Sequence, residues 1–187
     1  MFRQYLLSAK TSGNPISIYF DDEDAEKFSF GFVQDVSEEH ILLACVSPFG
    51  FYDGYDIIGY QSIRRLEMND RYGERVHKLY TIRGENHPPV PFASDSLILD
   101  LIRFSCDRRL VITVELDHSG YDDLQGMVSA VRDDAVLVNQ LDDDGHPDGE
   151  TVVPLDRITR VTCDSDREMA IKLLYEQRKG EDHEDLC

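Results

Sequence analysis

The chain has 187 residues, of which 41% are hydrophobic and 30% charged, a composition typical of a soluble globular protein with room for two small domains or one of ordinary size. Its formal net charge is −18, with 9 basic and 14 acidic residues in 1–93 and 10 basic and 23 acidic residues in 94–187. Such a field repels phosphate backbones and anionic membranes, so it disfavours a large nucleic-acid groove and DNA as a partner.

The sequence shows no targeting signal and no membrane segment. No apolar run approaches the roughly 20 residues that span a bilayer, and the first ten residues contain no long apolar segment. The four cysteines show no CxxC spacing, and Cys45 and Cys163 lie in apolar strand patterns typical of buried thiols. We therefore expect a cytoplasmic protein without membrane contact.

The first half of the chain is predicted to contain a helix, five short strands and a second helix. The apolar periodicities place these elements at 2–10 (helix), 16–20, 28–36, 40–46, 54–60 and 63–68 (strands), and from 69 or 70 onward (helix). Phe28, Phe30 and Phe32 alternate in the second strand, and Gly31 predicts a bend or bulge there.

Residues 83–93, RGENHPPVPFA, contain three prolines and no periodicity, which predicts a stiff linker. After it the same order of elements recurs, with a helix at 94–104, strands at 110–116, 125–131, 135–141, 150–154 and 158–163, and a helix behind a capping box, Ser165 to Glu168. The charged tail, 180–187, is predicted to be disordered.

The two halves match each other at an offset of 95 positions, without a gap, over 31–80 and 126–175. Identical pairs include Gly31/Gly126, Val33/Val128, Leu42/Leu137, Gly50/Gly145, Asp53/Asp148, Gly54/Gly149, Ile63/Ile158, Arg65/Arg160, Leu79/Leu174 and Tyr80/Tyr175. A single period of this kind indicates a tandem repeat, an internal duplication of one structural unit. We predict units at 1–82 and 94–179.

Five short antiparallel strands with a glycine bend in the second are expected to close into a small barrel, because closure removes the exposed edges. The predicted fold is therefore mainly β, in the α+β class, with two tandem barrels that each carry an N-terminal and a C-terminal helix. Residues 16–46 and 111–141, with their alternating apolar positions and one glycine, resemble the first motif of Sm-like domains. Other small barrels, of the SH3 or PRC type, fit nearly as well.

The resemblance implies RNA binding, for which an arginine patch of Arg64, Arg65 and Arg160 is the candidate. Within the matching stretch, Arg65/Arg160 is the one basic pair that is identical in both copies. RNA-binding members of the family usually carry an Arg-Gly type motif before the last strand, whereas this chain has QSIRRL and LDRITRV. We favour salt bridges to the protein's own carboxylates as the role of these arginines.

The stretch PFGFYDGY contains four aromatic residues in eight positions, Phe49, Phe51, Tyr52 and Tyr55. Exposed aromatic side chains mark binding surfaces. The alternative, which we favour, is that they pack against the second unit, which has no aromatic residues at 143–150. Asp53-Gly54 and Asp148-Gly149 predict turns. The acidic segment 142–150 departs from a calcium loop, which would need Asp at Gln140 and Glu at Thr151.

No catalytic constellation, metal-ligand spacing or cofactor motif is visible. We therefore expect a non-enzymatic cytoplasmic interaction or regulatory module that needs no cofactor and binds a protein partner or a second copy of itself. An RNA-binding Sm-like protein is the alternative.

Overall fold

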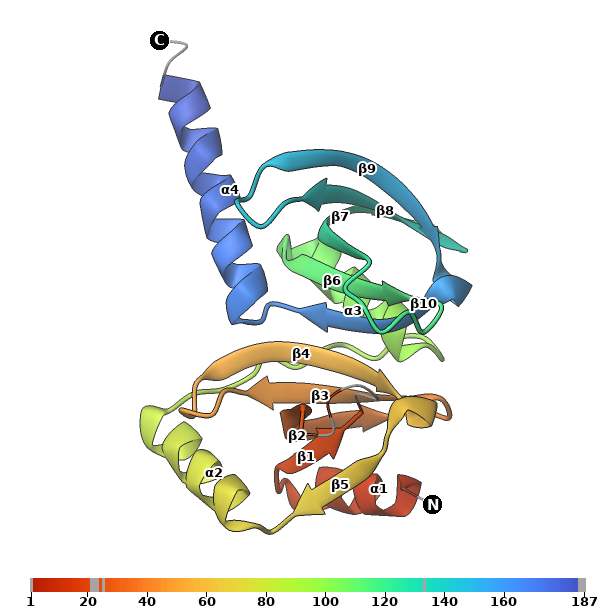
Figure 1. The fold of residues 1–187 in the computed structure, drawn as a ribbon, viewed down its shortest axis with the longest axis vertical. Coiled ribbons are helices and arrows are strands. Elements are labelled where there is room, and N and C mark those ends of the chain that lie inside the picture. Colours follow the sequence, from red (N-terminus) through yellow and green to blue (C-terminus); the bar gives the residue numbers. More distant parts are fainter. Residues whose placement is uncertain (1, 21–23, 25, 133, 185–187) are drawn as a thin grey trace. The chain divides into compact units, whose positions relative to one another are not determined.

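The structure is a computed structural model that describes residues 2–184 apart from 21–23, 25 and 133. The chain forms two compact units, Met1–Asp100 and Leu101–Cys187. The described residues contain ten antiparallel strands, five in each unit, and four α-helices (Figure 1). The predicted class, mainly β with flanking helices, is confirmed.

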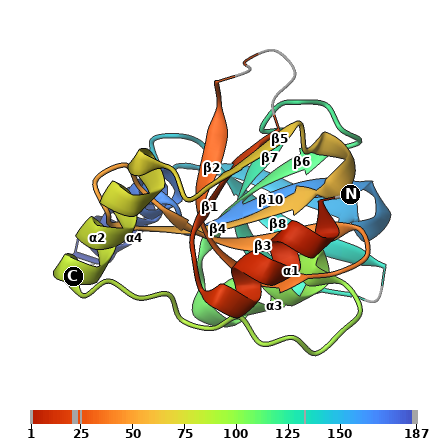
Figure 2. The same ribbon diagram turned by 90° about the horizontal axis from the view of Figure 1, so that it is seen from below.

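In the first unit a helix precedes five strands and a second helix follows them. The elements are α1 (Arg3–Ser12), β1 (Ile16–Tyr19), β2 (Phe28–Val36), β3 (His40–Val46), β4 (Tyr52–Gly59), the 3₁₀ turn η1 (Tyr60–Ser62), β5 (Arg65–Met68) and α2 (Arg71–Arg83). The strand order is β5-β1-β2-β3-β4. Helix α1 packs against β2, and Figure 2 shows α1 and α2 on different sides of these strands.

The second unit has the same succession of elements. They are α3 (Leu97–Arg108), which spans the boundary between the units, β6 (Val111–Leu116), β7 (Leu124–Val131), β8 (Ala135–Leu141), β9 (Pro147–Pro154), η2 (Leu155–Arg157), β10 (Ile158–Cys163) and α4 (Asp166–Glu184). The strand order is β10-β6-β7-β8-β9. The bounds of β8 and β9 follow those of β3 and β4 by 95 positions.

The predicted closure into barrels is not seen. In the first unit β5 pairs with β1 and is not a neighbour of β4 in the strand order, so the sheet stays open. Curvature comes instead from register shifts, which lie between Val33 and Asp35 in β2 and between Val128 and Ala130 in β7. A register shift bends a sheet and increases its twist without requiring its two edges to meet.

Gly31 and Gly126 have a different role from the predicted bulge. A Cβ atom at Gly31 would collide with the carbonyl group of Ala44 on the neighbouring strand, and one at Gly126 would collide with that of Asn139. Both glycines therefore permit a close approach of two backbones. The Asp-Gly pairs also differ from the prediction, because Gly54 (φ 66°) and Gly149 (φ 89°) lie inside β4 and β9, beside register shifts, rather than in turns.

The two C-terminal helices both pack on an apolar cluster, but they differ in the contacts that their first turns make. In the first unit the ring of Tyr72 in α2 makes T-shaped, edge-to-face contacts with Phe28 and Phe30, at ring-centre distances of 5.5 and 5.3 Å. In the second unit Arg167 of α4 pairs with two carboxylates, Asp122 at 2.5 Å and Asp143 at 3.1 Å. The predicted capping box is formed in part, since Glu168 accepts a hydrogen bond from the Ser165 N–H at 2.7 Å.

The predicted linker is fixed to the first unit. Residues 85–93 contain no helix or strand, yet His87, Pro88 and Val90 hydrogen-bond to residues of β2, β3 and β4. Helix α4 runs to Glu184, where the sequence predicted a disordered tail from 180, and 185–187 lie outside the described residues. No helix in the described part of the chain combines the length and apolar character needed to cross a membrane.

Candidate functional site

A tight loop between β3 and β4, residues 47–51, presents two of the predicted aromatic residues. Its ends are joined by hydrogen bonds from the Ser47 N–H to the Phe51 carbonyl at 3.0 Å and from the Gly50 N–H to the Ser47 carbonyl at 2.9 Å. The Ser47 hydroxyl accepts a further bond from the Phe51 N–H at 3.2 Å. We call these residues the aromatic loop.

Gly50 anchors the aromatic loop on α2. Its backbone has φ 77°, and an added Cβ would lie 2.5 Å from the Leu79 Cβ and 2.7 Å from the Tyr80 nitrogen. Only glycine adopts this conformation at little cost and leaves room for the helix. Near the end of α2, the Arg83 Nε–H donates to the Phe49 carbonyl at 3.0 Å. The loop is therefore held at both its centre and its tip.

The four predicted aromatic residues separate into two groups. Phe49 and Phe51 are 69% and 43% exposed, and the guanidinium of Arg83 lies 3.8 Å above the centre of the Phe51 ring. Tyr55 is buried, and its hydroxyl donates to the Pro88 carbonyl, while Tyr52 is half-buried. The favoured interpretation, that the four pack against the second unit, stays a prediction.

The second unit repeats the loop with different side chains at its tip. In the loop between β8 and β9 the Asp142 N–H donates to the His146 carbonyl, and the Gly145 N–H donates to the Asp142 carbonyl, both at 3.0 Å. A Cβ at Gly145 would lie 2.6 Å from the Tyr175 nitrogen of α4. At the positions of Phe49 and Phe51 stand Asp144 and His146.

The arginine that holds each loop was missed by the sequence comparison. Arg178 Nε–H donates to the Asp144 carbonyl at 3.3 Å, as Arg83 does to Phe49. The two arginines are 95 positions apart, so a comparison extended three residues beyond Tyr80/Tyr175 would have found this second identical basic pair.

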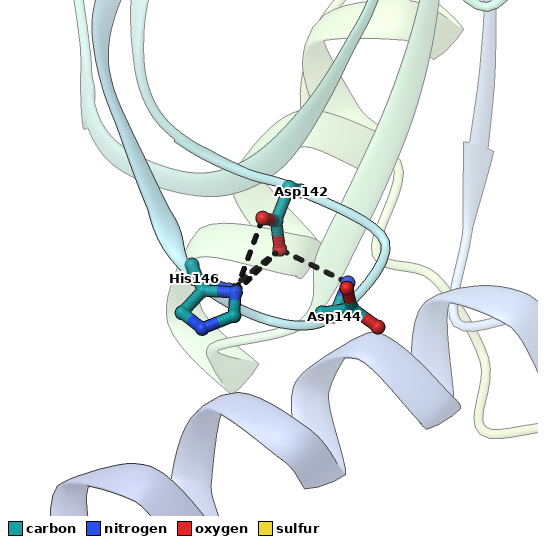
Figure 3. A group of neighbouring side chains, drawn as sticks. All are labelled: Asp142, Asp144 and His146. Atoms are coloured by element: carbon teal, nitrogen blue, oxygen red, sulfur yellow. Dashed lines mark hydrogen bonds and ion pairs between the residues drawn. The ribbon is translucent and has the colours of Figure 1, made fainter.

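Asp142, Asp144 and His146 form the group of potential metal ligands shown in Figure 3. Their ligand atoms lie within 4.8 Å of one another, an arrangement that offers two carboxylates and an imidazole to a cation. Asp142 already accepts hydrogen bonds from the Asp144 and His146 N–H groups at 2.9 and 2.8 Å. The hydrogen bond from the His146 N–H lowers the pKa of Asp142 most, and the bond from the Asp144 N–H lowers it further. The Asp142 carboxylate therefore stabilises the turn.

His87 lies in an enclosure of three tyrosines, a feature that sequence reasoning missed. Its ring contacts those of Tyr52, Tyr55 and Tyr80, at centre distances of 4.5, 5.5 and 5.7 Å. Nε2 lies 2.8 Å from the Cys45 carbonyl, which can only accept, so Nε2 carries the proton. Nδ1 therefore accepts from the Tyr80 hydroxyl at 2.8 Å.

The surroundings keep His87 neutral. Burial lowers its pKa to about 4, and its backbone hydrogen bonds act weakly in the opposite direction. A cavity of about 480 Å³ opens beside it between α2 and the sheet, with Phe32, Gln34 and Tyr80 in its wall. The neutral imidazole fixes the segment after α2 to β3 and is engaged on both nitrogens.

In the predicted arginine patch, Arg65 contacts an aromatic ring and a carboxylate of its own unit. The Arg65 guanidinium lies 3.8 Å above the ring of Tyr19, and Nε lies 3.2 Å from a carboxylate oxygen of Glu67. Arg64 and Arg65 belong to the first unit and Arg160 to the second. The favoured role, a salt bridge to an internal carboxylate, is confirmed for Arg65.

The chain was compared with protein-family models, curated proteins and solved structures. No family model matches the chain, and no curated protein or solved structure matches it.

Proposed function

We propose that this protein is a non-enzymatic interaction module made of two Sm-like units that arose by duplication, and that its protein partner binds the aromatic loop. Support for a duplicated unit comes from the 95-residue offset, which recurs in strand bounds, register shifts and loop hydrogen bonds. Support for an Sm-like unit is the succession of a helix and five antiparallel strands with a glycine in the second.

The observation that carries the proposal is the exposure of Phe49 and Phe51 on a rigid loop. Exposing two phenyl rings to water is unfavourable in free energy, and a bound partner would remove that apolar surface from water. Exposed apolar patches therefore mark interaction surfaces. Hydrogen bonds within the loop and the contact of Gly50 with α2 restrict its movement, so little conformational entropy is lost on binding. The equivalent loop of the second unit has Asp144 and His146 at these positions, which supports a partner surface on the first unit.

The expected partner presents apolar side chains to the two rings within an otherwise basic surface. Aromatic residues and arginine dominate binding energy at interfaces, and here Arg83 is already oriented against Phe51. The net charge of −18 steers positively charged proteins toward this chain and slows the approach of anionic ones.

RNA binding, the alternative, is less well supported. The charges of Arg65, Arg157 and Arg167 are each offset by a carboxylate within 3.2 Å. A nucleic acid would have to displace these pairs against the acidic field of the whole chain.

The test compares partner capture by the full chain with capture by a Phe49→Ser, Phe51→Ser double variant. Leu173→Ser is the matched control, because Leu173 is an exposed apolar residue of the second unit. A protein that is retained by wild type and the control but lost with the double variant is then purified, and its affinity is measured by calorimetry. Loss of about tenfold or more is expected from removing two central aromatic anchors.

Two results would contradict the proposal. One is a purified partner that binds the double variant as tightly as wild type. The other is a high 260/280 nm absorbance ratio of the purified protein, together with a salt-sensitive shift of random RNA that an Arg65→Glu, Arg160→Glu variant abolishes, which would establish RNA as the ligand.

A further inference from the structure

The second unit contains a cavity of about 470 Å³ between β7, β8, the end of α3 and α4. Its floor is apolar, with Met127, Leu141 and Tyr175, which belong to the core cluster that holds α4. Polar groups of Ser129 and Asn139 lie in the same wall. This volume is in the range of roughly 300–1,000 Å³ that small-molecule sites occupy.

Two cationic side chains line this cavity in the more acidic half of the chain. Arg109 makes no ion pair with the residues that the structure describes, and the Lys179 ammonium lies 4.6 Å above the ring of Tyr175. One carboxylate, that of Glu176, also lines the cavity. Since residues 94–187 contain 23 acidic side chains, a cavity edge with two cations and one carboxylate is a local reversal of charge.

Arg109 occupies a backbone position that glycine usually takes. Arg109 directly follows α3 in the left-handed conformation, φ 52°, with hydrogen bonds from its own N–H to the Cys106 carbonyl and from the Leu110 N–H to the Ser105 carbonyl. Glycine is the usual residue at this position of a helix end, and Gly13 occupies it after α1. An arginine here destabilises the native state relative to glycine.

We propose that this cavity binds a small amphipathic anion, a carboxylic or sulfonic acid with an aromatic or branched apolar group. The acid group contacts Arg109 and Lys179, and the apolar group covers Met127, Leu141 and Tyr175. Ser129 and Asn139 supply further hydrogen bonds. The site is independent of the aromatic loop, which lies in the first unit, so the two proposals succeed or fail separately.

The half-buried Cys106 lines the cavity and offers a local reporter. Burial, and to a smaller extent the charge of Asp107, raises the pKa of its thiol, so it alkylates slowly. Cys45 and Cys163 are buried, and a Cys187→Ser background removes the remaining thiol. The alkylation rate of Cys106 with iodoacetamide then reports whether the cavity is occupied.

The experiment uses 8-anilinonaphthalene-1-sulfonate as the anionic probe and N-phenyl-1-naphthylamine as its uncharged analogue, on the full chain. We expect saturable fluorescence with one probe per chain and a Cys106 alkylation rate that falls several-fold as the probe saturates. Arg109→Gly and Lys179→Gln should each weaken the sulfonate by about tenfold, the effect of losing one charged hydrogen bond. Binding of the uncharged analogue should be unchanged, and Arg103→Gln, an exposed position of α3 outside the cavity, should bind like wild type.

Arg109→Gly separates a ligand role from a structural one, because it should raise the urea midpoint while it lowers affinity for the sulfonate. The proposal is overturned if the folded protein shows no sulfonate binding, if saturation leaves Cys106 alkylation unchanged, or if Arg109→Gly and Lys179→Gln bind the sulfonate like wild type.

Discussion

Replacing Gly50 by alanine should detach the aromatic loop from α2 and destabilise the first unit. Two effects add. A non-glycine residue at φ 77° costs about 1 kcal/mol, and the new Cβ, 2.5 Å from the Leu79 Cβ and 2.7 Å from the Tyr80 nitrogen, adds about 1–3 kcal/mol of overpacking. The free energy of unfolding should therefore fall by about 2–4 kcal/mol.

Gly84→Ala is the matched control. Gly84 ends α2 with φ 70°, and an added Cβ would meet no atom within 4 Å. Only the backbone cost of about 1 kcal/mol applies to it. Unfolding in urea is followed by far-ultraviolet circular dichroism and by tyrosine fluorescence, since the chain has no tryptophan, and the curves are fitted with one transition per unit. Equal losses for the two variants would refute the role assigned to Gly50.

Three further outcomes are expected. First, the folded-state pKa of His87, about 4, lies below the ordinary value of 6.5, so the unfolded state binds more protons between these values. The contribution of His87 to the free energy of unfolding should be full above pH 6.5 and decrease by roughly 2–3 kcal/mol as the pH falls to 4. In urea titrations at several pH values, the unfolding free energy of His87→Gln should depend less steeply on pH than that of wild type. An identical pH dependence would contradict the assignment. Second, Arg109→Gly should raise the free energy of unfolding by about 1 kcal/mol in urea, and a loss would show that the arginine stabilises the fold. Third, Tyr55→Phe should cost about 1 kcal/mol in the same assay, because the Pro88 carbonyl loses its donor, and an unchanged midpoint would argue against that bond.

Much of the secondary structure follows from periodicity and glycine positions alone. The apolar alternation of 28–36 and 40–46 coincides with β2 and β3, and the glycines at 50 and 145 are matched because each is pressed against a helix. Closure of the sheet could not be derived, because the same alternation suits an open, curved sheet and a barrel equally well.

The enclosure of His87 could not be predicted for a different reason. A single histidine between Asn86 and Pro88 carries no periodic signal, and its partners Cys45 and Tyr52 lie more than 30 positions away in sequence. The exposure of Phe49 and Phe51 was equally hidden, since an aromatic residue gives the same pattern whether a loop turns it toward solvent or toward the core.

Tyr72 and Arg167 occupy equivalent positions in the first turns of α2 and α4, and their contacts respond differently to the salt concentration. The edge-to-face aromatic contacts of α2 depend little on ionic strength, whereas the exposed ion pairs of Arg167 with Asp122 and Asp143 weaken as salt screens them. Concentrated salt should therefore weaken these ion pairs at the start of α4, whereas the buried contacts of Ile171 and the packing of Tyr175 keep the helix on its sheet. The two helices occupy equivalent positions in the repeat and both pack on an apolar cluster, but only α4 adds contacts whose strength depends on the salt concentration.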